Sequence, residues 1–183
     1  SHFGKVNKYT SYALRGKVLF YQDKFAEAAS ALDNVIGVYS LVSDYGSQFL
    51  RFGENDPESV FEIQYSNQSN WYDWGCAHCS EGNYAIIMNG PRGWSGPEYA
   101  QGWSFNVPTA EFYNSFEEGD TRIEATVLDI EAFAAATGAN YTEGYDHTGY
   151  FNNKYIPRAG ESGGQTELNY LTNFRIIRYS DVL

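Results

Sequence analysis

Hydrophobic residues recur at helical spacing in two short segments near the start of the chain, separated by the polar residues 22–24. The residues that share the inner faces are Tyr12, Gly16 and Leu19 in the first segment and Phe25, Ala28, Leu32 and Val35 in the second. Gly16 and Ala28 are small enough to let two helix backbones approach closely. The spacing predicts an antiparallel helical hairpin of tetratricopeptide type over residues 8–37.

Shorter patterns follow the hairpin. A half-buried strand is predicted where apolar residues alternate with polar ones, at Phe61, Ile63 and Tyr65. Thr109 is expected to cap a helix. The buried face of that helix is expected to consist of Phe112, Tyr113 and Phe116. Residues 123–127 alternate as a second strand would, although they also fit a helix continuing through the alanine-rich residues 131–136. The fold class is therefore predicted to be mostly α, with short strands and irregular loops.

Residues 66–102 follow neither period. Six glycines and two prolines interrupt this stretch, and Ile86 and Ile87 are expected to pin it to a core. Long loops inside compact domains are uncommon unless they have a function. This aromatic-rich loop region is therefore where we expect a binding surface.

Composition narrows the possible partners. Twelve basic and twenty-three acidic residues give a formal net charge of −11, which disfavours nucleic acid and anionic lipid surfaces. Four Trp, sixteen Tyr and twelve Phe are more rings than core packing alone needs. A sugar ring has apolar faces that stack on aromatic rings and hydroxyl groups that need polar partners. The predicted ligand-binding residues are Asn70, Trp71, Tyr72, Asp73, Trp74, Arg92, Trp94 and Tyr99.

Each of these aromatic residues also has a structural interpretation. Trp71 or Trp74 could instead plug the loop onto the core, and Trp103 is expected to pack rather than to bind ligand. Cys76 and Cys79 favour a local disulfide or two unpaired thiols, because a zinc site needs two further ligands and only His78 lies near. No cofactor and no metal site is predicted.

No catalytic arrangement stands out. Glu117, Glu118 and Asp120 could in principle supply the two carboxylates of a glycoside hydrolase. Their crowding at a helix end is more typical of solvated turn charges, and Asp120 is expected to pair with Arg122. The chain is predicted not to be an enzyme.

An ordered set of short motifs resembles the SusD/RagB family of surface glycan-binding lipoproteins. The motifs occupy residues 4–8, 13–35, 39–41, 55–65, 107–112, 119–122, 150–155 and 174–183, and include Val107-Pro108-Thr109-Ala110-Glu111-Phe112 and Gly119-Asp120-Thr121-Arg122. Members of the family are two to three times longer, so the resemblance implies that residues 1–183 form a single partial SusD-like domain, an internal fragment. The family's ligand residues have no fixed motif, and none is carried over by position.

The resemblance implies an outer-membrane protein exposed at the cell surface, which captures oligosaccharide or polysaccharide for a SusC-like TonB-dependent transporter. Contact with the membrane would be made only through a lipid anchor absent from this chain. Two other hypotheses remain open. The hairpin could belong to a peptide-binding repeat scaffold, although only one complete helix pair is visible. The aromatic region could line the cleft of a hydrolase.

Overall fold

The structure, a computed structural model, describes residues 4–68, 74–163 and 168–183. The chain divides into two compact units. Unit 1 comprises Ser1–Asp44, Phe52–Gln64 and Asn173–Leu183, and unit 2 comprises Tyr45–Arg51 and Tyr65–Thr172. The prediction of one partial domain over residues 1–183 stays a prediction. Within the described ranges, no helix has the length and apolar character needed to cross a bilayer.

Helices, short strands and irregular connections alternate along the described chain. The helices are α1 (Lys8–Phe20), α2 (Phe25–Leu32), α3 (Ala85–Met88), α4 (Ala110–Asn114), α5 (Ile123–Thr126) and α6 (Ile130–Thr137). The strands are β1 (Ser59–Ile63), β2 (Arg92–Ser95), β3 (Val127–Asp129), β4 (Asn140–Thr142), β5 (Tyr150–Asn152) and β6 (Phe174–Arg178). They form three two-stranded antiparallel sheets, which pair β1 with β6, β2 with β4 and β3 with β5.

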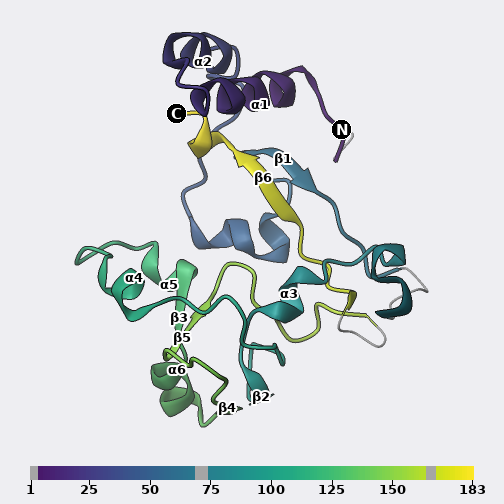
Figure 1. The fold of residues 1–183 in the computed structure, drawn as a ribbon, viewed down its shortest axis with the longest axis vertical. Coiled ribbons are helices and arrows are strands. Elements are labelled where there is room, and N and C mark those ends of the chain that lie inside the picture. The colour runs from purple at the N-terminus through teal and green to yellow at the C-terminus, as the bar shows by residue number, and fades with distance from the viewer. Residues whose placement is uncertain (1–3, 69–73, 164–167) are drawn as a thin grey trace. The chain divides into compact units, whose positions relative to one another are not determined.

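The predicted hairpin is present in unit 1, where α1 and α2 lie side by side (Figure 1). The side chain of Asn7 caps α1 by accepting hydrogen bonds from two backbone N–H groups. A Cβ atom at Gly16 would lie 2.4 Å from Leu32 Cδ2, so only glycine allows this contact between the helices. The expectation that Phe25 faces inward is wrong. Phe25 begins α2, is exposed, and packs edge-to-face on Phe20 at the turn.

Strand β1 turns the opposite face inward from the one predicted. Val60 and Glu62 are buried, whereas Ile63 is 40% exposed. The Glu62 carboxylate lies 3.3 Å from Arg175 Nε on the paired strand β6, and it also accepts a hydrogen bond from the side chain of Asn173. A buried charge is stable only when it is paired and hydrogen-bonded. We attribute the orientation of β1 to this polar network, which an alternation of apolar residues cannot reveal.

Unit 2 packs around two clusters of buried side chains. One cluster contains Tyr99, Leu128, Ile130, Phe151 and Ile156, and the other contains Ile86, Ile87 and Tyr170. The burial of Ile86 and Ile87 confirms their predicted anchoring role.

Two predicted elements of unit 2 differ from the structure. Residues 123–126 form helix α5 instead of the predicted strand, and the strand β3 begins only at Val127 and is followed by α6. The predicted buried face at Phe112, Tyr113 and Phe116 is wrong, because none of the three is buried and α4 ends at Asn114, before Phe116. Thr109 does cap α4, with its hydroxyl oxygen 3.2 Å from the backbone nitrogen of Phe112.

Candidate functional site

Three aromatic side chains form a continuous, partly exposed group in unit 2, which we call the aromatic platform. Its members are Trp74, Trp103 and Phe105. The ring centroids of Trp74 and Trp103 lie 5.3 Å apart with planes inclined by 30°, and Phe105 meets Trp103 edge-to-face at 6.3 Å. Trp74 and Phe105 are each 50% exposed. Apolar ring surface of this kind suits the C–H faces of a sugar.

The platform rests on a rigid backbone segment. Residues 102–105 donate four successive backbone hydrogen bonds of 2.8–2.9 Å to carbonyl groups between residues 87 and 91. A Cβ atom at Gly102 would lie 1.7 Å from the carbonyl oxygen of Asn89, so this close approach requires glycine. Ser104 and Asn106 have φ values of 58° and 53°, a conformation that is uncommon outside glycine. Strained backbone of this kind clusters at functional sites.

Arg92 supplies a charged group at one end of the platform. Its Nε atom donates a 2.7 Å hydrogen bond to the carbonyl oxygen of Trp103, and its guanidinium lies 5.6 Å from the centroid of the Phe105 ring. The side chain is exposed. Among the described residues, its two terminal nitrogens have neither a hydrogen-bond acceptor nor a carboxylate partner. They are therefore available to donate to ligand hydroxyl groups beside the rings.

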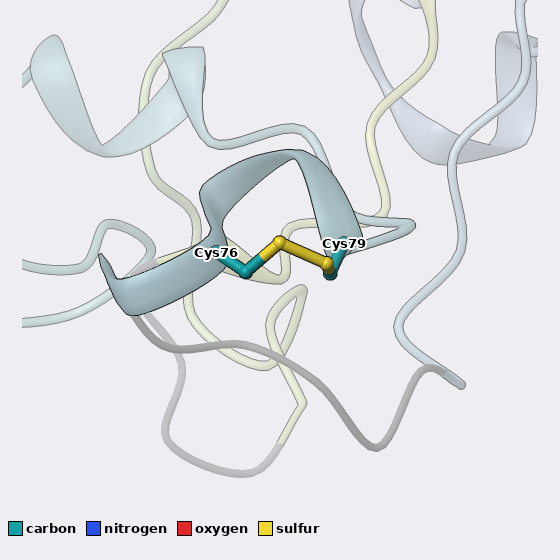
Figure 2. Close-up of a disulfide and its surroundings, with 2 residues drawn as sticks. All are labelled: Cys76 and Cys79. Carbon is teal, nitrogen blue, oxygen red and sulfur yellow. A yellow bond between two sulfur atoms is a disulfide. The ribbon is translucent and has the colours of Figure 1, made fainter.

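A disulfide lies beside Trp74 in the chain. Residues Trp74–Cys79 form a 3₁₀ turn, and Cys76 and Cys79 are joined within it (Figure 2). This resolves the alternatives for the two cysteines in favour of the local disulfide. Trp103 packs against the Ile86–Ile87–Tyr170 cluster on one side and against Trp74 on another, so it links the turn to the core of unit 2.

The other predicted ligand residues have different surroundings. Asn70, Trp71, Tyr72 and Asp73 lie outside the described residues. Trp94 is half-buried and packs on Tyr99 and Phe133.

Tyr99 is a core residue in this structure. It is only 4% exposed, and its hydroxyl donates to Asn153 Oδ1 at 3.2 Å. Burial, with a further contribution from the Glu98 carboxylate, raises the pKa of Tyr99 to about 12. Its ring therefore offers no open face to a sugar, and only Trp74 and Arg92 of the predicted, described residues meet at the platform.

Sequence reasoning missed two members of the platform. The sequence favours a packing role for Trp103, which does contact the core but also packs against Trp74. Phe105 lies outside the aromatic-rich region predicted over residues 66–102. The signal that could have extended the region is Gly102 itself, since a glycine between aromatic residues often marks a close backbone approach.

Among the acidic residues near α4, Asp120 is held by a basic partner. Asp120 is bound by Arg122 at 2.6 Å, which confirms the predicted pair, and hydrogen bonds from Arg122 lower the pKa of Asp120 to about 2. Its carboxyl is thus held in the ionised form, unsuited to donating a proton near neutral pH. The described residues also contain no group of three or more potential ligands that could hold a metal ion.

Unit 1 contains a separate cavity of about 970 Å³. Asp56 lies in its lining, and burial raises the pKa of that carboxyl. Of the predicted ligand residues that the structure describes, none lines this cavity, and the aromatic residues in its described lining are Tyr39 and Phe61. We therefore place the candidate site at the aromatic platform rather than at the cavity of unit 1.

Comparison with known proteins connects the chain to one group. No protein-family model matches it. It is 27% identical over 135 residues to SusD-like protein P2 of Formosa agariphila. Among solved structures, it is similar to a laminarin-binding SusD-like protein, with 37% identity and a TM-score of 0.88 over 98% of this chain. Surface glycan-binding protein A from Bacteroides thetaiotaomicron, solved with laminarihexaose, matches with 29% identity and a TM-score of 0.90 over 99% of this chain.

These relatives are much longer than the chain. The match to the Formosa protein covers 69% of this chain but only 25% of the length of the Formosa protein. It spans 42% of each of the two solved structures.

Proposed function

Because the chain is a SusD-like homologue, we propose that the protein to which it belongs binds oligosaccharide or polysaccharide at the cell surface without catalysing a reaction, and that the aromatic platform contributes to the binding site. The observation that carries this proposal is that exposed, closely packed rings lie beside the two terminal guanidinium nitrogens of Arg92, which have no hydrogen-bond partner among the described residues. The rings supply stacking and Arg92 supplies hydrogen bonds, the two interactions that a saccharide needs.

The glycan is proposed to be of the laminarin type. Two of the structural relatives, at 37% and 29% identity, are described by their binding to laminarin or laminarihexaose. Both similarities extend over nearly all of this chain. Asn70, Trp71, Tyr72 and Asp73 stay in the proposal as further ligand residues, because they precede Trp74 directly and combine rings with polar groups.

The proposal extends to location and transport. We propose that the protein lies at the outer membrane, exposed to the outside and held by a lipid anchor, and delivers glycan to a SusC-like TonB-dependent transporter. The support is the resemblance to SusD-like surface proteins. Affinity isolation of the tagged protein from detergent-solubilised outer membranes should recover such a transporter, and repeated recovery of the protein alone would count against this part.

The hairpin of α1 and α2 is proposed to be a tetratricopeptide-type element that serves as scaffold. The support is the close approach of Gly16 to Leu32 and to the backbone of Ala28. A peptide-binding function is not adopted, because only one such pair is seen among the described residues and repeat scaffolds stack several.

Calorimetric titration of the intact protein with laminarihexaose tests the main proposal. Trp74→Ala is expected to weaken binding by about tenfold or more, since buried aromatic anchors contribute about 2 kcal/mol at binding sites. The matched control is Tyr145→Ala, which removes a ring that is 93% exposed in unit 2 and outside the platform. It should bind as the wild type does.

Two outcomes would contradict the proposal. Equal affinity of wild type and Trp74→Ala would remove the platform from the site. Shortening of the hexaose during long incubation, seen by chromatography, would indicate a hydrolase instead.

A further inference from the structure

We infer that the Cys76–Cys79 disulfide is a positioning element for Trp74: it fixes the turn that carries this ring to the body of unit 2 and thereby sets the affinity of the aromatic platform for glycan. The inference rests on the proposed function. It assigns the two cysteines a role in ligand binding that neither the motif nor the comparisons give them.

The disulfide spans a break in the turn. The segment Trp74–Cys79 consists of two short helical pieces that meet at Cys76, whose φ and ψ angles of −147° and 72° are not helical. The Cα atoms of Cys76 and Cys79 lie 5.3 Å apart across this kink (Figure 2). The covalent bridge therefore links the residue at the kink to the last residue of the turn.

The chain directly after the disulfide is firmly attached to unit 2. The Ser80 hydroxyl donates to the carbonyl oxygen of Leu168 at 3.0 Å. The Asn83 side chain donates to the carbonyl oxygen of Thr172 at 2.9 Å. A Cβ atom at Gly82 would lie 2.3 Å from Asn169 Cα, which shows how closely the backbones meet. Cys79 is thus the last residue of the turn before an immobile segment.

The disulfide also restrains the position of Trp74 relative to this attached segment. Cys76 is bonded to Cys79, and Trp74 lies only two residues before Cys76. The Trp74 ring stacks on Trp103 and still exposes half of its surface. Without the bridge, the turn and its ring would be less restrained before ligand binds, and the entropic cost of ordering them would reduce affinity. With it, the ring is already in place.

The experiment is a double-mutant cycle on the intact protein, read by calorimetric titration with laminarihexaose. The combined variant Cys76→Ser/Cys79→Ser is expected to bind roughly three- to tenfold more weakly than the wild type, which corresponds to ordering one side chain and its turn. The same pair of substitutions in a Trp74→Ala background is expected to change affinity by less than about twofold, since the group being positioned is gone. Thermal unfolding midpoints of all four proteins are measured alongside.

The outcomes separate the inference from the proposed function. If the wild type and Trp74→Ala differ in affinity but removal of the disulfide changes nothing, the inference is overturned and the proposed function stands. Equal weakening in both backgrounds also overturns it, because the disulfide would then act through other residues. If the wild type binds no glycan, both fall. Should the serine variant fail to fold, dithiothreitol can reduce the native protein, being itself oxidised to its cyclic disulfide, and alkylation of the freed thiols then allows the same comparison.

Discussion

Two of the aromatic clusters in unit 2 have similar ring spacing but different exposure. In the platform, centroids of neighbouring rings lie 5.3 and 6.3 Å apart. In the second cluster, which we call the core aromatic cluster, Trp94, Tyr99 and Phe133 lie 5.1–6.0 Å from one another. Tyr99 is 4% exposed, whereas Trp74 and Phe105 are each 50% exposed.

The difference comes from what covers the rings. The core aromatic cluster packs among Leu128, Ile130 and Phe151, contributed by β3, α6 and β5, so apolar side chains lie against it from several elements. The platform is supported from beneath by the backbone of residues 87–91 and by the cluster around Ile86. Ring type and ring spacing therefore do not distinguish a core from a binding surface. What distinguishes them is whether further elements of the fold pack over the rings and cover them.

The largest effect should come from breaking the core aromatic cluster. Tyr99→Ala removes a buried ring and leaves a cavity, so the free energy of unfolding should fall by about 3 kcal/mol or more. Urea denaturation followed by circular dichroism measures this change. Affinity for laminarihexaose, corrected for the folded fraction, should stay near the wild-type value. A specific loss of affinity in fully folded Tyr99→Ala would mean that the two clusters are not functionally separate.

An intermediate effect is expected at Trp103, which belongs to the platform and also packs on a cluster of buried side chains. Trp103→Ala removes the support of Trp74 and also a ring packed on the Ile86–Ile87–Tyr170 cluster. Because Trp103 is only partly buried, the free energy of unfolding should fall by about 2 kcal/mol, less than for Tyr99→Ala.

Affinity for laminarihexaose should fall in Trp103→Ala as well, unlike in the control Tyr145→Ala. Denaturation and calorimetry on the same preparations provide both values. Loss of stability with unchanged affinity would make Trp103 a packing residue alone, as the sequence predicts.

The smallest effect concerns the hydroxyl of Tyr99. Its pKa of about 12 lies above the ordinary value of 10.0 because the neutral form is favoured by burial. The unfolded chain loses this proton first, so the stability that the neutral hydroxyl provides is present below about pH 10 and is lost as the pH rises through 12.

Tyr99→Phe tests this dependence by urea denaturation at increasing pH. At neutral pH the variant should be less stable by about 1 kcal/mol, because the hydrogen bond to Asn153 is lost. The deficit should shrink and then reverse above about pH 10. A deficit that does not vary with pH would show that Tyr99 ionises as it does in the unfolded chain.

Local chemistry predicted several elements correctly. The helical hairpin follows from small residues at close-contact positions, the cap at Thr109 from its hydroxyl, and the pair of Asp120 with Arg122 from opposite charges two residues apart. Each of these depends on residues near one another in sequence, or on packing between adjacent segments. The prediction of which face of β1 is buried was wrong, because that orientation depends on Arg175, which lies more than a hundred residues from Glu62 in the chain.

The binding residues show the same limit. Half of the Trp74 side chain is exposed, as its predicted display requires, but the sequence makes Tyr99 and Trp94 look suitable for a sugar as well. Only the pairing of β3 with β5 and the packing of α6 decide that Tyr99 is enclosed.

By itself, the sequence of this protein determined which rings, amides and charges were present, where short helices could begin, and which family its motifs resemble. The tertiary structure decided which rings keep an open face, which side of β1 is buried, and that Trp103 and Phe105 join Trp74 and Arg92 at one surface. The physical reason is that exposure and cavity shape are set by contacts between segments distant in the chain, whereas capping, turn formation and helical spacing are set by neighbours.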